Sequence, residues 1–194
     1  MPRSIEIIIA VLATLVLLPL LLLLGFLLRG YDDGPALYRA RRVGKGGKEF
    51  TLYKFRTMVV DAALRGPALT TESDWRITPI GRILRRTKCD ELPQLLNVLK
   101  GDMSFVGPRP EDPRYVALYS PEQRKVLDLR PGVTSPASLH YRDESSLLTG
   151  PDAQEKYVHQ ILPHKLAIEL EYRHQKSAWT DVVIVLRTIR AMFI

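Results

Sequence analysis

The sequence contains a single cysteine, Cys89, among its 194 residues. One thiol excludes an intramolecular disulfide framework and a metal cage built from several cysteines. The chain also has no GxxxxGK[ST] or GxGxxG phosphate loop, no HExxH zinc helix and no GxSxG nucleophile elbow. The common nucleotide-binding loops, the metalloprotease helix and the hydrolase elbow therefore do not supply its chemistry.

Charge is absent from one long segment near the N-terminus. Residues 7–28 read IIIAVLATLVLLPLLLLLGFLL, without a single ionisable side chain. At about 1.5 Å per helical residue, this run can cross a hydrocarbon core of roughly 30 Å. It is too long for the apolar part of a cleaved signal peptide, and RGYDDGPALY after it offers no small-x-small cleavage site. We therefore expect an anchored protein whose remaining part is polar and basic, with a net charge of +7 that suits anionic lipid or phosphorylated molecules.

Two membrane arrangements are compatible with this segment. A simple spanning helix would place the arginine-rich stretch after it inside the cell. Alternatively, Pro19 lacks an N–H and clashes with the preceding turn, so a helix broken there could enter and leave by one face. Arg3 and Arg29 flank the segment on both sides, as two ends on the cytoplasmic face would require. The physics of the segment leaves both arrangements open.

The rest of the chain predicts an α+β fold, mostly helical, with one short β-hairpin. Alternating basic, aromatic and branched residues on both sides of Gly44–Gly47 predict the hairpin. The other expected elements are a short basic helix over 80–86, a helix over 90–99, a turn over 130–134, a helix over 152–175 broken at Pro163, and an amphipathic helix over 179–194 with Trp179 as an interfacial anchor.

The first candidates for chemistry are Asp90 and Glu91, at the expected start of a helix. The positive end of the helix dipole predicts lowered pKa values and two ionised carboxylates. One carboxylate can attack phosphorus while its neighbour holds a divalent cation. The structural alternative is ordinary helix capping, since Asp and Glu are both favoured in a first turn.

Basic side chains are the second set of candidates. Arg109 lies between Pro108 and Pro110, which restrict the backbone that carries its phosphate-matching guanidinium. Other arginines, Arg82, Arg85 and Arg86, precede the carboxylate pair, and they also suit a face that meets anionic lipid. Lys54 and Arg56 would point the same way from a strand, either toward a phosphate or toward solvent.

These residues together form a pattern that resembles the bacterial sugar transferase family, the monotopic phosphoglycosyl transferases. The resemblance is carried by Pro19 in the apolar segment and by three stretches, ALYRARRVGKGGKEFTLYKFRTM, DWRITPIGRILRRTKCDELPQLLNVLKGDMSFVGPRPE and LRPGVTSPASL. It covers the whole chain. Two positions depart from the family pattern: Glu6 stands where an Asp often follows the first basic residue, and Leu18 stands where a Ser commonly precedes the proline.

The resemblance implies an activity and a site. Family members transfer a phospho-sugar from a UDP-sugar to undecaprenyl phosphate, releasing UMP, at the cytoplasmic face of the bacterial inner membrane. By this resemblance Asp90 is the nucleophile of a ping-pong reaction, Glu91 is a Mg²⁺ ligand, and Arg85 and Arg109 meet phosphate. Residues 1–29 would form a re-entrant helix broken at Pro19, and residues 30–194 the membrane-associated catalytic domain. The sugar is left open, as is a homodimer.

Two other functional classes fit the composition. A non-catalytic lipid-headgroup scaffold would use the basic surface and the C-terminal helix, and a tethered nucleic-acid binder would use the charge alone. Asp90 and Glu91 discriminate among these classes, because a phosphate-binding scaffold gains nothing from two carboxylates beside arginines. We therefore expect a transferase with no nucleic-acid partner.

Overall fold

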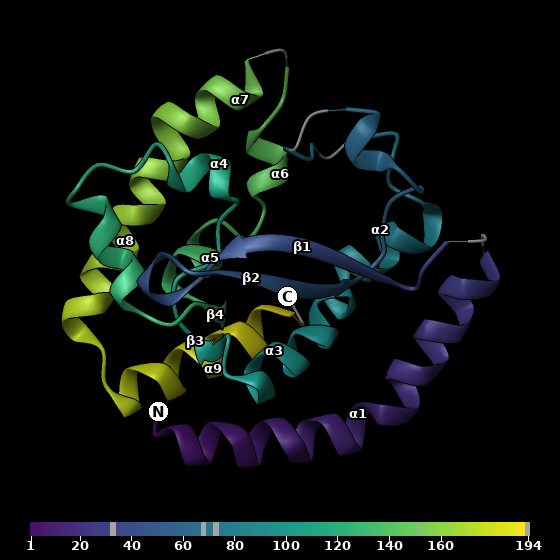
Figure 1. The fold of residues 1–194 in the computed structure, drawn as a ribbon, viewed down its shortest axis with the longest axis horizontal. Coiled ribbons are helices and arrows are strands. Elements are labelled where there is room, and N and C mark those ends of the chain that lie inside the picture. The colour runs from purple at the N-terminus through teal and green to yellow at the C-terminus, as the bar shows by residue number, and fades with distance from the viewer. Residues whose placement is uncertain (32–33, 67–68, 72–73, 151, 193–194) are drawn as a thin grey trace.

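The computed structural model describes residues 1–31, 34–66, 69–71, 74–150 and 152–192. This part of the chain is α+β and mostly helical, with a central hairpin and a long N-terminal helix along one side, as predicted (Figure 1). The helices and strands are α1 Arg3–Tyr31, β1 Leu37–Val43, β2 Glu49–Phe55, α2 Pro79–Arg86, α3 Leu95–Lys100, β3 Ser104–Val106, α4 Pro113–Val116, β4 Gly132–Thr134, α5 Pro136–His140, α6 Glu144–Leu147, α7 Ala153–Lys156, α8 Leu162–Gln175 and α9 Ala178–Met192. Short 3₁₀ segments are η1 Lys45–Gly47, η2 Ala62–Leu64, η3 Cys89–Gln94 and η4 Gln123–Asp128, and η5 Tyr157–Ile161 is a π turn.

The hairpin forms where the sequence predicts it. β1 and β2 pair antiparallel with Leu37 opposite Phe55. The turn between them contains Gly46 and Gly47, both with positive φ (69° and 76°), a conformation that favours glycine. The hairpin extends across the middle of the molecule (Figure 1). Lys54 lies one residue before the end of β2.

One buried side chain joins the outer edge of β2 to α3. Asn97 is fully buried, and its Oδ1 accepts a hydrogen bond from the Tyr53 N–H at 3.0 Å. Its Nδ2 donates to the Thr51 carbonyl oxygen at 2.7 Å. The amide of Asn97 therefore binds the strand edge as a neighbouring peptide group would, and it fixes α3 against the hairpin.

The predicted turn over 130–134 is wrong, because its second half is a strand. β4 runs parallel to β3, and the two strands lie so close that a Cβ on Gly132 would come within 2.1 Å of the Gly107 nitrogen. Gly107 donates to the Thr134 carbonyl, and Gly132 donates to the Pro108 carbonyl, both at 3.0 Å. A strand of three residues is too short to show an alternating pattern, whereas Pro-Gly is a strong turn signal.

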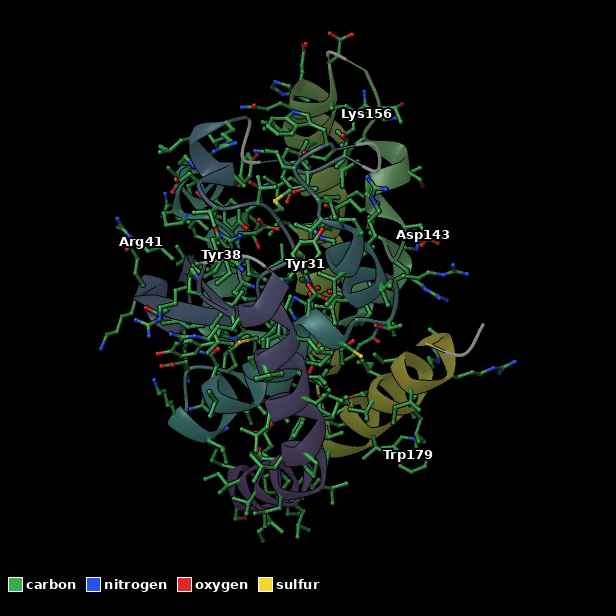
Figure 2. All side chains as sticks on the ribbon, turned by 90° about the vertical axis from the view of Figure 1, so that its right-hand side faces the viewer. Tyr31, Tyr38, Arg41, Asp143, Lys156 and Trp179 are labelled. Atoms are coloured by element: carbon green, nitrogen blue, oxygen red, sulfur yellow. The ribbon has the colours of Figure 1, made fainter. Side chains whose placement is uncertain are left out.

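The C-terminal third is helical. The expected helix over 152–175 consists of α7, η5 and α8, which follow one another without an intervening loop. Pro163 lies in the first turn of α8, where its missing N–H is tolerated, and the irregularity is the π turn that precedes it. On α9 the apolar Ile184 packs on Val106 and Tyr172, whereas Trp179 is 73% exposed at the outer side of the helix (Figure 2).

Helix α1 is continuous through Pro19, so the chain does not leave the helical conformation there. The helix axis nevertheless changes direction along its length, and the two parts lie along different sides of the molecule (Figure 1). Most side chains between the two ends are apolar and exposed, including Val16 and Phe26, each 77% exposed. By length and composition this is a helix that could cross a membrane.

Both ends of α1 contact the same globular body. At the start, the Arg3 guanidinium donates to the carbonyl oxygens of Val98 and Met103, and the Ser104 hydroxyl donates to Glu6. Glu6 also forms an ion pair with Arg3, so the family departure at this position keeps the charge. At the other end, Leu28 is 2% exposed and packs on Phe55 and Leu84.

Candidate active site

Asp90 and Glu91 lie in the first turn of the 3₁₀ helix η3 rather than of an α-helix. The preceding helix α2 is capped by Thr78, whose hydroxyl oxygen accepts from the Gly81 N–H at 3.0 Å. Lys88 then adopts a left-handed conformation (φ 57°), which reverses the chain and starts η3. The predicted helix over 90–99 is therefore correct in place, but its first turn is 3₁₀ and α-helix begins only at Leu95.

Glu91 is held by two cationic side chains from other parts of the fold. Its Oε1 accepts from Lys54 Nζ of β2 at 2.7 Å and from a guanidinium nitrogen of Arg109 at 3.3 Å. Burial alone would raise the pKa of Glu91, but the charges of Lys54 and Arg109 outweigh it and hold that pKa well below its usual range. Burial lowers the pKa of Lys54, and the Glu91 carboxylate opposes that shift.

Asp90 lies in a different environment from its neighbour. It is 7% exposed, and within the described part of the chain its Oδ1 has no hydrogen-bond partner. Burial raises the pKa of Asp90, and Lys54 and Arg85 act in the opposite direction. The predicted lowering is thus right for Glu91 and wrong for Asp90, because desolvation outweighs any dipole of so short a turn.

Arg85 faces this pair, and the two neighbouring arginines do not. Its Nε donates to the Thr57 hydroxyl at 2.8 Å, and the charge of Asp90 partly offsets the lowering of the Arg85 pKa by burial. Arg82 and Arg86 lie on the exposed side of α2. The structure therefore brings one of the three upstream arginines into the site.

Lys54 and Arg56 diverge instead of forming one basic stripe. Lys54 points to Glu91, while a terminal nitrogen of Arg56 donates to the Leu28 carbonyl of α1 at 3.4 Å. Arg56 lies just beyond the end of β2, where strand alternation no longer applies, and it is 8% exposed. Its hydrogen bond to the α1 backbone directs it away from Lys54.

The loop around Arg109 is rigid on both sides. Pro108 and Pro110 are buried, whereas the Arg109 side chain is 41% exposed and open to a ligand. The contact between β3 and β4 fixes this loop, since the Pro108 carbonyl accepts from Gly132. The charge of Glu91 raises the pKa of Arg109, which stays a cation.

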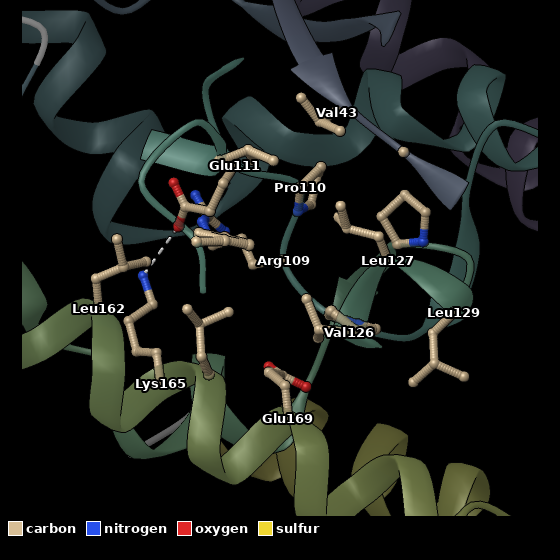
Figure 3. Close-up of a pocket in the computed structure, with 16 residues that line it drawn as sticks. Val43, Arg109, Pro110, Glu111, Val126, Leu127, Leu129, Leu162, Lys165 and Glu169 are labelled. Carbon is tan, nitrogen blue, oxygen red and sulfur yellow. Dashed lines mark hydrogen bonds and ion pairs between the residues drawn. The ribbon is translucent and has the colours of Figure 1, made fainter. Parts of the chain in front are cut away.

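A cluster of polar residues behind this loop, in which Lys165 and Tyr157 are buried, is not evident from the sequence. Lys165 of α8 is 5% exposed and contacts Glu111, Glu144 and the hydroxyl of Tyr157. Figure 3 shows Lys165 pointing from α8 toward Glu111, beside a cavity of about 30 Å³ that Arg109 also lines. No short motif marks these residues, because they come from four separate segments.

A metal ion would find few protein ligands here. The described residues hold no group of three or more His, Cys, Asp or Glu side chains suited to a metal. Mg²⁺ is commonly held by one or two carboxylates together with substrate phosphates, and Asp90 and Glu91 supply that number. Both cationic contacts of Glu91 are made through Oε1. The donor set therefore fits a Mg²⁺ ion that arrives with a phosphorylated substrate.

The arrangement suits phosphate chemistry. Lys54 and Arg85 act on the buried carboxylate of Asp90, whose Oδ1 has no partner among the described residues, and Arg109 contacts the adjacent Glu91. Cations of this kind can neutralise a diphosphate while the carboxylate approaches phosphorus. The same geometry is of no use to a scaffold that only binds lipid headgroups.

Comparisons with known proteins find a matching family and similar sequences. The family described as "Bacterial sugar transferase" matches residues 1–194. The chain is 38% identical over 193 residues to a UDP-glucose:undecaprenyl-phosphate glucose-1-phosphate transferase from Caulobacter vibrioides, covering 98% of this chain and 68% of the relative. It is 34% identical over 195 residues to a UDP-N-acetylgalactosamine-undecaprenyl-phosphate N-acetylgalactosaminephosphotransferase from Aeromonas hydrophila, covering 98% of this chain and 43% of the relative.

Proposed function

Because the chain belongs to the bacterial sugar transferase family, we propose that it transfers a phospho-sugar from a UDP-sugar to undecaprenyl phosphate and releases UMP. The named relatives use two different sugars, so their names support the class of donor and acceptor but not one sugar. The product, an undecaprenyl-diphospho-sugar, would begin the assembly of a surface glycan.

The proposed reaction has two displacements at Asp90. In the first, a carboxylate oxygen of Asp90 forms a bond to the sugar-proximal phosphorus, and the bond from that phosphorus to the bridging oxygen breaks, so UMP leaves. In the second, a phosphate oxygen of the lipid attacks the same phosphorus, and the bond to Asp90 breaks and restores the carboxylate. A single phosphate site can then serve a soluble donor and a membrane-bound acceptor in turn.

The observation that carries this proposal is the contrast between the two adjacent carboxylates. Glu91 is paired with Lys54 and Arg109. Asp90 Oδ1 is buried near the charges of Lys54 and Arg85, and it has no hydrogen-bond partner among the described residues. An oxygen kept free of hydrogen bonds can approach phosphorus without first breaking one. Arg85 and Arg109 would hold the diphosphate and stabilise the negative charge that develops on UMP.

Mg²⁺ would add charge neutralisation at the diphosphate. Glu91 is the proposed ligand, through the carboxylate oxygen that does not contact Lys54. Arg109 and Lys54 would meanwhile fix the Glu91 side chain, so that its orientation is set before the donor binds.

We further propose that α1 re-enters the cytoplasmic face instead of crossing the membrane. The polar contacts of Arg3 and Glu6 with the body, together with the packing of Leu28, support this arrangement, because both helix ends then lie on one side. The exposed apolar side chains between them would contact lipid. On α9, an exposed row would lie at the interface; it comprises Trp179, Val182, Leu186 and Ile189.

The decisive experiment follows the fate of the donor phosphate. Purified protein is incubated with a panel of UDP-sugars, Mg²⁺ and undecaprenyl phosphate, and UMP release is compared between the wild type and Asp90→Asn. We expect release by the wild type only, and a phospho-sugar mass adduct on the wild-type chain when the acceptor is omitted. Equal UMP release by both proteins would refute the role of Asp90.

A further inference from the structure

The acidic surroundings of Arg109 pose a problem for phosphate binding. Besides Glu91, the charges of Glu111 and Glu144 act on the Arg109 guanidinium and favour its charged form. Carboxylates near an arginine compete with phosphate for its donors and repel an incoming diphosphate. In the proposed reaction, a group that neutralises these two carboxylates would keep Arg109 available.

Lys165 is placed to do this. Its Nζ lies 2.8 Å from Glu144 Oε2 and 3.4 Å from Glu111 Oε1, so one ammonium group pairs with both carboxylates. It is 5% exposed, which protects the pairs from the screening that weakens surface ion pairs. The side chain reaches this position from α8 and points toward Glu111 of the Arg109 loop (Figure 3).

Tyr157 fixes the same cluster from a second direction. Its hydroxyl donates to Glu111 Oε1 at 2.8 Å and lies 3.4 Å from Lys165 Nζ. Tyr157 begins the π turn η5, and a turn of this rare type often marks a functional position. Glu111 is also tied to the hairpin, because its carbonyl oxygen accepts from the Val43 N–H at 3.0 Å.

We infer that Lys165 is a positioning residue of the transferase, which acts through Glu111 and Glu144 to hold the Arg109 loop and keep its guanidinium free for the donor diphosphate. This inference rests on the proposed function for the identity of the ligand, but the contacts that carry it are within the chain. Each carboxylate near Arg109 has a lysine partner. Lys54 pairs with Glu91, and Lys165 pairs with Glu111 and Glu144. Loss of Lys165 removes the ammonium group that pairs with both Glu111 and Glu144.

The test uses the full-length protein in nanodiscs and four variants. Lys165→Met removes the ammonium group, Lys165→Arg keeps a charge, and Lys165→Met combined with Glu111→Gln removes one carboxylate as well. Lys125→Met is the matched control, since Lys125 forms an exposed ion pair with Glu122. Hydrogen exchange of a peptide covering residues 104–119 reports on the loop without any ligand, and titration with UDP reports on phosphate binding.

We expect Lys165→Met to raise the UDP dissociation constant by about tenfold or more and to speed exchange of the 104–119 peptide. The added Glu111→Gln change should recover at least half of each effect on a logarithmic scale, and Lys165→Arg should recover most of both. If Lys165 only packs the core, the double variant is worse than the single one; that result overturns the inference. Unchanged exchange and UDP affinity in Lys165→Met overturn it equally.

The proposed function fails separately. A wild type that binds no UDP refutes the proposed donor, and the exchange measurements still decide whether Lys165 positions the loop. If Lys125→Met reproduces the Lys165→Met effects, they reflect general loss of charge, and the inference is wrong.

Discussion

Lys54 and Glu91 form a 2.7 Å ion pair that links the end of the hairpin to the start of η3. Each side chain is less than one-fifth exposed, so the pair is shielded from water on most sides. The geometry makes Lys54 part of the carboxylate site, although it is 36 residues away from Asp90 in the sequence.

Lys54→Met should reduce UMP release by about 100-fold or more, because it removes a preorganised positive charge from the phosphate site. It also leaves Glu91 with one cationic partner, Arg109. Lys100→Met is the control, since Lys100 also contacts the hairpin, through the Tyr53 hydroxyl, but on an exposed surface. The measurement is the initial rate of UMP release by both variants. A similar loss of rate in Lys100→Met would indicate damage to the hairpin and not to the site.

Glu91→Gln should abolish turnover across the whole range of Mg²⁺ concentrations that supports the wild type. An amide keeps the size of the side chain but loses the negative charge that a hard divalent cation requires. The measurement is UMP release as a function of added Mg²⁺. Wild-type Mg²⁺ dependence in this variant would remove Glu91 from the metal site.

Asp90→Asn should inactivate the protein and stabilise it. Burial raises the folded-state pKa of Asp90, so stability from the protonated form is present at low pH and lost as pH rises through that pKa. At neutral pH the ionised carboxylate therefore costs stability, and an amide removes the cost. We expect a gain of about 1 kcal/mol, or ~2–4 °C in Tm. A lower Tm in thermal unfolding at pH 7.5 would contradict this account.

Glu169→Gln should stabilise the protein increasingly as pH rises. Glu169 is 3% exposed, and burial raises its pKa to about 7, although Ser135, the Ala137 backbone and Lys165 oppose that shift. The protonated form contributes stability that is complete below the unfolded-state pKa of 4.5 and is lost as pH rises through about 7.

Above pH 7 this difference amounts to about 3 kcal/mol in the free energy of unfolding. Denaturant unfolding of the wild type and Glu169→Gln should give similar stability at pH 5 and diverge by pH 8. Glu122→Gln, at an exposed ion pair, should show no such divergence. Parallel curves for the wild type and Glu169→Gln would show that Glu169 does not titrate in this range.

The membrane arrangement can be tested by labelling. A cysteine placed at Pro2 should react with an impermeant maleimide from the same side of the membrane as a cysteine placed at Lys45 in the hairpin turn. The reason is that the contacts of Arg3 and Glu6 hold the start of α1 against the globular body. Protein with Cys89 alone gives the background. Labelling of the two positions from opposite sides would establish a spanning helix.

Local patterns were sufficient to predict the elements with strong signals. The glycine-rich turn predicted the hairpin, and Gly101 with its positive φ ends α3 one residue beyond the predicted end at position 99. The β3–β4 pair was not predicted, because these short strands are defined by their pairing with each other and not by a pattern in their own residues. The continuity of α1 through Pro19 likewise depends on how the helix bends.

The sequence predicted the residues of the candidate site better than it predicted their pKa shifts. Motif and charge identified Asp90, Glu91 and Arg109, which the structure brings together with Lys54 and Arg85. The opposite pKa shifts arise from burial at Asp90 and from the charges of Lys54 and Arg109 at Glu91, and adjacency in sequence reveals neither. The partners of Lys165 come from distant segments, so no local pattern could identify them.

Asn97 also covers part of the free edge of the two-stranded β1–β2 sheet. The free edge of a two-stranded ribbon is a template on which another polypeptide can add a strand, and such addition leads to aggregation. With its amide on Thr51 and Tyr53, Asn97 occupies the donor and the acceptor that an intruding strand would need first. One side chain therefore blocks edge-to-edge self-association at the middle of the ribbon. Other folds use an additional strand for this purpose.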